Sequence, residues 1–172
     1  MKKVIFLFVL LSFCTIVLAQ DRIMTHRGDT IVCKISELTD NNIKYRFEGE
    51  DLLNNISKNL VREIKFSNNR IQKISEKVVI NGLEDWQKVK ITNLESDISG
   101  LNRKGEFTAN AASGWSTTGE GKMQAKAMDK LKKQASEVGA HIVLILTTTS
   151  KGGGHGMSGG TKASVTGVAY SY

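Results

Sequence analysis

The chain has 172 residues, and 24 Lys or Arg against 17 Asp or Glu give it a formal net charge of +7. Acidic residues are interspersed among the basic ones without a run of five like charges, which indicates a solvated basic surface rather than a polyanion-binding tail. After residue 19 no apolar segment approaches the roughly 20 residues that a membrane-spanning helix needs, which excludes a further span.

The first residues predict a secretory signal peptide over residues 1–19. Two lysines form a positive n-region, an almost wholly apolar stretch follows, and Ala19 supplies a small residue at the cleavage point. We therefore expect cleavage after Ala19 and a periplasmic or secreted protein of residues 20–172. An uncleaved anchor is the alternative. A lipoprotein acylated at Cys14 is disfavoured, because Phe13 rather than a small residue precedes that cysteine.

Residues 20–75 predict a small all-β domain. The segment 26–29 has turn chemistry, and Ile31, Cys33 and Ile35 then alternate with outward residues as in a half-buried strand. Five short strands in succession predict a β-meander that closes into a small barrel. Cys33 is the only cysteine after the leader, so we expect a core residue without a disulfide partner.

The stretches GDTIVCKISELTDNNIKYRF and LVREIKFSNN of this domain resemble small SH3- or Sm-like barrel modules of exported proteins from Bacteroidetes-type bacteria. The similarity is a pattern of turns and apolar positions. It implies a barrel fold and an exported protein, and it brings no catalytic residue with it.

Residues 76–85 predict a connector, and residues 86–172 predict a second domain with the order β-β-α-β-β. Its first two strands are expected within WQKVKITN and KGEFTANAAS, and its last two at 141–149 and 162–171. One helix packed on an antiparallel sheet would complete this domain, so the fold class expected for the whole chain is α+β.

The helix is expected over residues 120–138. Its apolar side recurs at spacings of three and four and carries Met123, Ala127, Leu131, Ala135 and Val138. Thr117 and Glu120 have the form of a capping box at its start. Gly139 is placed to end it, because glycine adopts the left-handed conformation without steric cost.

The loop after the strand at 141–149 contains Gly154, Gly156 and Gly159 in the G-x-G-x-x-G spacing of a dinucleotide site. In such a site the loop opens a helix whose amides meet the pyrophosphate, whereas here it opens the β-forming strand 162–171. We therefore expect no nucleotide cofactor. The loop is interpreted as a partner-binding hairpin tip with the candidate residues Lys151, Gly154, His155, Gly156 and Met157.

The start of the helix gives a second phosphate hypothesis. Gly121 and Lys122 have the order found at the end of a P-loop, but Ser116 and Met123 stand where that motif needs glycine and a hydroxyl residue. A helix N-terminus still favours an anion. A weak anion contact is therefore predicted at Thr118, Gly121 and Lys122.

No set of residues has the pattern of a catalytic or metal centre. His26, His141, His155, Met157 and Cys33 have no chelate spacing to one another in the sequence, so no metal cofactor is expected. A buried Cys33 would be a poor nucleophile. The acidic residues form no recognisable acid–base pair. The two tryptophans are interpreted as core residues.

The C-terminal part, AMDKLKKQASEVGAHIVLILTTT with TGVAYSY, is similar to a recurring domain of the bacterial cell envelope. The YdgH/BhsA/McbA stress and biofilm proteins have this shape, and the Rcs-pathway sensor lipoprotein has a similar segment. The resemblance implies an envelope location, and the chain lacks the sensor's lipobox and disulfide cysteines. The residues that carry it are packing residues: Leu131, Ala135, Gly139, Ala140, Ile142, Val143, Gly167, Ala169 and Tyr170.

We therefore expect an exported, non-enzymatic envelope protein that acts as a binding or stress-related module. The partner candidates are an envelope protein, a glycan, an anionic lipid surface or a second copy of the chain, and export disfavours nucleic acid. Two alternatives stay open. One is a hydrolase or metal-dependent enzyme with its site between the two domains. The other is a self-assembling subunit that adds an exposed strand, such as 162–171, to a partner sheet.

Overall fold

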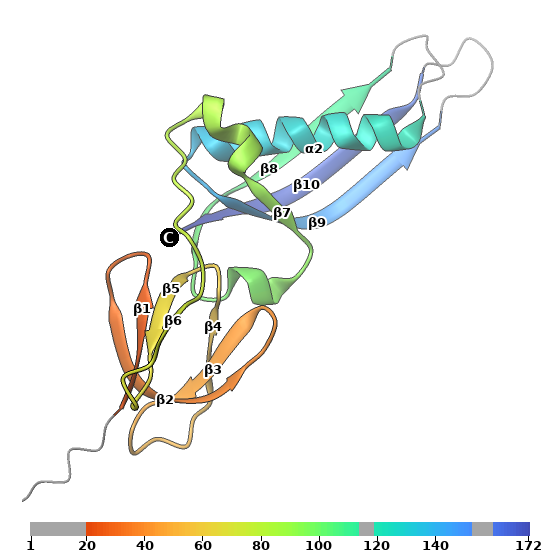
Figure 1. Ribbon diagram of the computed structural model, residues 1–172. Coiled ribbons are helices and arrows are strands. Elements are labelled where there is room, and N and C mark those ends of the chain that lie inside the picture. Colours follow the sequence, from red (N-terminus) through yellow and green to blue (C-terminus); the bar gives the residue numbers. More distant parts are fainter. Residues whose placement is uncertain (1–19, 114–118, 153–159) are drawn as a thin grey trace, which may run out of the picture.

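The computed structural model describes residues 20–113, 119–152 and 160–172, which form two β-sheets and one long helix (Figure 1). The expected α+β class is confirmed. The first sheet has the strand order β4-β3-β2-β1-β5-β6, and all its neighbouring strands are antiparallel. Its strands are β1 (Asp21–Thr25), β2 (Thr30–Leu38), β3 (Asn42–Arg46), β4 (Asn54–Ser57), β5 (Val61–Lys65) and β6 (Ile71–Lys73).

One face of the first sheet is a core, as the alternating pattern predicts. Cys33 lies in the middle of β2 and is 2% exposed, with Ile31 and Ile35 partly buried beside it. The predicted turn at 26–29 is confirmed, with Gly28 at a φ of +100°. The fully buried aliphatic residues of the neighbouring strands are Ile23, Ile43, Val61 and Ile64.

The predicted closed barrel of five strands is wrong. Strands β4 and β6 lie at the two edges of the first sheet and do not pair with each other, so this sheet is open. One of the six strands, β4, was not predicted, because it has too few apolar residues to be recognised from its own pattern. It is held because Ile56 is buried in the core and the buried Ser57 hydroxyl donates to Asp97 O at 2.8 Å.

The second sheet has the order β7-β9-β10-β8 and is covered on one face by α2 (Figure 1). Strand β10 lies between β9 and β8 and is hydrogen-bonded on both sides, so segment 162–171 is not the exposed strand that was expected. The elements are β7 (Lys90–Thr92), β8 (Asn102–Ala112), α2 (Glu120–Glu137), β9 (Ile142–Lys151) and β10 (Lys162–Ser171).

The second sheet is mixed rather than purely antiparallel, because β7 is parallel to β9. Strand β8, at the other edge of the sheet, runs in the same direction as β7, and the connection between them contains the short 3₁₀ helix η2 (Glu95–Ile98). Trp86 was expected in a strand but lies in the 3₁₀ helix η1 (Leu83–Lys88). The Asp85 carboxylate holds this turn, since it accepts from Asn81 N at 2.9 Å and pairs with Lys88 at 2.6 Å.

The helix agrees with its prediction at both ends to within one residue. Met123, Ala127, Leu131 and Ala135 are buried against the sheet, and Gly139 has a φ of +68°. Val138 is wrongly predicted, since it follows the last helical turn and is 39% exposed.

Packing of the helix on the sheet depends on small residues. A Cβ on Gly167 would lie 2.7 Å from Val143 Cγ1, 2.8 Å from Leu144 O and 3.3 Å from Leu131 Cδ2 of the helix, so a larger residue would force these neighbours to shift. The predicted capping box is not confirmed. Thr117 is outside the described residues, and Gly119 stands at the N-cap without a side-chain hydrogen bond.

The first sheet is joined to the residues that follow η2 by hydrogen bonds to their backbone oxygens. Ser57 N donates to Ser99 O at 3.0 Å, and Arg27 Nη2 donates to Gly100 O at 2.7 Å. Each sheet has a separate apolar core. None of the helices among the described residues is both long and apolar enough to cross a membrane.

Candidate functional site

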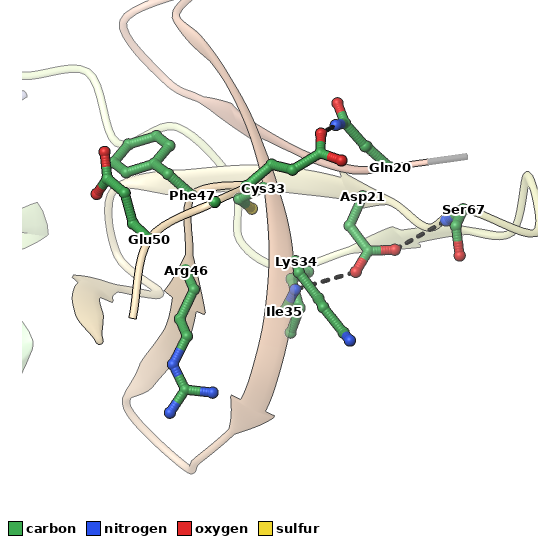
Figure 2. A pocket seen from close by; sticks show the side chains of 11 residues that line it. Gln20, Asp21, Cys33, Lys34, Ile35, Arg46, Phe47, Glu50 and Ser67 are labelled. Atoms are coloured by element: carbon green, nitrogen blue, oxygen red, sulfur yellow. Dashed lines mark hydrogen bonds between the residues drawn. The ribbon is translucent and has the colours of Figure 1, made fainter. Parts of the chain in front are cut away.

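The first sheet contains a pocket, here called the end pocket, where β1 begins (Figure 2). Its volume is about 560 Å³, within the range of small-ligand sites in proteins. The walls come from the first residues of β1, the middle of β2, the end of β3 with the loop after it, and the turn after β5. The lining residues are Gln20, Asp21, Cys33, Lys34, Ile35, Arg46, Phe47, Glu48, Gly49, Glu50 and Ser67.

Asp21 fixes the shape of the end pocket. One oxygen of its carboxylate accepts from Ile35 N at 3.0 Å, and the other accepts from Ser67 N at 2.8 Å. These two bonds join β1, β2 and the turn after β5 (Figure 2). Across the pocket the Gln20 amide donates to the Glu48 carboxylate, which holds the β3–β4 loop against the start of β1.

Two cations stand side by side in the end pocket. Lys34 and Arg46 are register partners on β2 and β3, so their side chains leave the sheet on the same face. Among the described residues neither forms a salt bridge. Like charges placed directly opposite destabilise a sheet, which favours an anionic group of a ligand between them.

Phe47 and Cys33 give the wall an apolar part, beside the carboxylates of Asp21, Glu48 and Glu50. The Phe47 ring is 40% exposed and meets Tyr45 edge-on, with 5.5 Å between the ring centroids. Burial, with a smaller effect of Asp21, raises the pKa of the Cys33 thiol to about 12. Cys33 is therefore a neutral thiol at physiological pH, and the prediction of a core cysteine is confirmed.

A second group of polar residues, here called the junction, lies between the two sheets. Tyr172, at the end of the chain, stacks on His141 at 3.9 Å between centroids and lies 5.0 Å from the His26 ring. The Tyr172 hydroxyl accepts from Val78 N at 2.9 Å. One aromatic side chain thus contacts the first sheet, the second sheet and the segment that joins them.

Both junction histidines are held neutral. Burial lowers the pKa of His141 to about 4, with a further effect of His26, and His141 Nε2 has no hydrogen-bond partner among the described residues. The pKa of His26 is also lowered, first by burial and then by Lys77 and Arg62. Only the folded structure shows that these two histidines share a neighbour.

Within the part of the chain that the structure describes, His26 and Ser75 resemble a nucleophile with its base. His26 Nε2 lies 2.8 Å from Ser75 Oγ. The serine proton, however, goes to Val61 O at 2.8 Å, so His26 Nε2–H donates to Ser75. A hydrogen bond in this direction leaves the serine hydroxyl without a base.

The predicted anion contact at the helix start has an acidic neighbour. Lys122 N donates to Gly119 O at 3.1 Å, and Gly121 is exposed. The Glu120 carboxylate is held there by Ser150 Oγ at 2.8 Å, so an added anion would be repelled. Thr118 lies outside the described residues.

The predicted partner-binding loop is described only at its edge. Lys151 is exposed at the end of β9 and opposite Lys162 of β10. Gly154, His155, Gly156 and Met157 lie outside the described residues.

The candidate metal ligands do not converge where the structure describes them. No group of three His, Cys, Asp or Glu side chains in residues 20–113, 119–152 and 160–172 could hold a metal ion.

Comparison with known proteins finds no matching family model, no similar curated protein and no similar solved structure. The two resemblances drawn from the sequence therefore stay predictions.

Proposed function

We propose that the protein is an exported, non-enzymatic binding module of the bacterial cell envelope, and that the end pocket holds its ligand. The observation that carries the proposal is the paired Lys34 and Arg46 in a pocket of about 560 Å³ whose only thiol is protonated. Export is supported by the leader pattern. An envelope location is supported by the packing pattern of residues 125–172.

The end pocket favours a short chain that carries charges of both signs. Lys34 and Arg46 would receive a carboxylate, which relieves the repulsion between them. Glu48 and Glu50 on the loop opposite would receive an amino group, and the exposed part of the Phe47 ring offers an apolar contact. Peptide-bearing amino-sugar chains of the cell wall have these three features. We therefore assign a wall glycopeptide as the ligand class.

We also infer that residues 20–75 and 86–172 are two folding units joined by the connector 76–85. The inference is supported by the two separate cores. In this arrangement the first unit would bind the ligand, and the second unit would hold the protein at its place in the envelope.

The test is calorimetric titration of the purified protein with soluble muropeptides. Arg46→Gln should weaken binding at least about tenfold, the usual loss for a hydrogen bond to a charged group. Lys44→Gln is the matched control, because it removes the same charge from the same strand. Lys44 does not line the pocket and pairs with Glu37 at 2.8 Å. Equal losses in the two variants, or no saturable binding, would refute the assignment.

A hydrolase that uses Ser75 is the second candidate, on the 2.8 Å contact between His26 and Ser75; it requires the serine to donate to His26, the reverse of the direction that its bond to Val61 O gives. A fluorophosphonate probe separates it from the binding module. Labelling that disappears in Ser75→Ala would support the hydrolase, whereas an unlabelled protein that binds muropeptides supports the binding module.

A further inference from the structure

An open hollow of about 560 Å³ lies at the other end of β1 from the end pocket. It is formed by the turn between β1 and β2, the start of β5, and the end of β6 with the residues after it. Four cationic side chains and one carboxylate line this basic hollow. The lining residues are Thr25, His26, Arg27, Gly28, Arg62, Lys73, Ser75, Glu76 and Lys77.

The two arginines keep free donors. Arg27 uses Nη2 to bind Gly100 O at 2.7 Å, and Arg62 uses Nη2 to bind Glu63 at 3.0 Å. A guanidinium has five N–H groups in a planar fork. Each arginine therefore has most of its donors left for a ligand in the hollow, and its existing bond fixes the direction of the fork.

The two lysines differ in their pairing. Lys73 is bound to Glu76 at 2.8 Å, which neutralises the one carboxylate of the hollow. Lys77 forms no salt bridge with any described residue, and its ammonium lies 5.8 Å from the centroid of the Tyr172 ring. With the Lys73–Glu76 and Arg62–Glu63 pairs counted as neutral, the hollow keeps two positive charges, on Arg27 and Lys77.

Two of the cationic side chains act on the same residue of the wall. His26 lies in the wall of the hollow, and Lys77 and Arg62 both act on it in the direction that lowers its pKa, after burial. The field of these two cations is therefore felt by a side chain that is itself 7% exposed. An anion bound beside them would reverse this effect on His26.

We propose that the basic hollow is a binding site for a phosphate monoester group. A carboxylate would neutralise only one of the two unpaired charges, whereas a phosphate monoester carries a charge of about −1.5 to −2 and three acceptor oxygens at neutral pH. Arginine forks match this geometry. The site is separate from the end pocket, so it goes beyond the proposed function and does not depend on it.

The test uses the purified protein, with glucose 6-phosphate as the soluble probe and phosphatidic acid vesicles as the lipid probe. Lys77→Gln and Arg62→Gln should each weaken binding about tenfold or more. Lys65→Gln is the matched control, because it removes one charge from β5 without lining the hollow, and it should change the affinity less than about twofold. Saturable binding of the soluble probe assigns a soluble phosphoester, and binding of vesicles alone assigns a lipid headgroup. Either result supports the site.

Proton NMR of His26 gives an independent readout. Probe binding should raise the His26 pKa, and it should not do so in Lys77→Gln at the same probe concentration. Three results would overturn the proposal: no saturable binding to either probe, an equal loss in Lys65→Gln, or equal affinity for a single-stranded DNA oligonucleotide. Muropeptide binding tests the end pocket separately, so the two proposals can fail independently.

Discussion

The stability of the protein should fall in mild acid because of His141. This histidine is 3% exposed and its pKa in the folded state is about 4, against 6.5 for a free imidazole. A histidine with a lowered pKa binds fewer protons when folded than when unfolded. The lowered pKa of His141 therefore leaves the free energy of unfolding unchanged above pH 6.5. It reduces that free energy increasingly as the pH falls from about 6.5 toward 4. At one pKa unit per 1.36 kcal/mol, the free energy of unfolding should drop by about 3 kcal/mol.

The variant His141→Phe isolates this effect. Phenylalanine keeps a ring on Tyr172 and removes both the titrating group and the unpaired Nε2. Urea unfolding followed by circular dichroism should be measured at pH 7.5 and pH 4 in both proteins. The carboxylates and the other histidines are common to the two, so their contributions cancel. Wild type should lose about 3 kcal/mol more than the variant between the two pH values, and an equal loss would refute the assignment of His141.

Three further predictions concern packing. Gly167→Ala should destabilise by about 1–3 kcal/mol in thermal unfolding, because its Cβ would lie 2.7 Å from Val143 Cγ1, whereas Gly121→Ala, with nothing within 4 Å, should stabilise by about 0.5 kcal/mol. Leu131→Asp places a charge at the fully buried centre of the helix–sheet contact and should abolish the helical circular dichroism signal; a native spectrum would refute it. Asp97→Ala leaves the Thr92 hydroxyl without its 2.8 Å acceptor and should cost about 2 kcal/mol in urea unfolding, while Asp40→Ala at the exposed turn should not.

The sequence predicts the elements whose pattern depends on local periodicity. The helix, with Met123 and Leu131 at its buried face, and the strand that carries Cys33 follow from spacings of three to four and of two. Strand β4 could not be predicted in this way, since its place in the sheet depends on the bond from Ser57 to Asp97, which is 40 residues away. The parallel pairing of β7 is equally non-local.

The functional surfaces are less predictable for the same reason. The basic hollow takes Arg27 from a turn, Arg62 from β5 and Lys77 from the connector, and none of these has a local motif. Lys34 and Arg46 face each other only because a bulge between Ile35 and Glu37 sets the register of β2 and β3. The glycine spacing at 154–159 was visible in the sequence, but it lies outside the described residues.

Tyr172 gives the junction a role that neither sheet has alone. Its ring stacks on the buried His141, its hydroxyl accepts from Val78 N of the connector, and Lys77 of the basic hollow lies over its face. Tyr172 therefore contacts the second sheet, the connector and a residue of the basic hollow. Replacing Tyr172 by alanine should expose His141 and raise its pKa toward 6.5, which an NMR titration of His141 would detect.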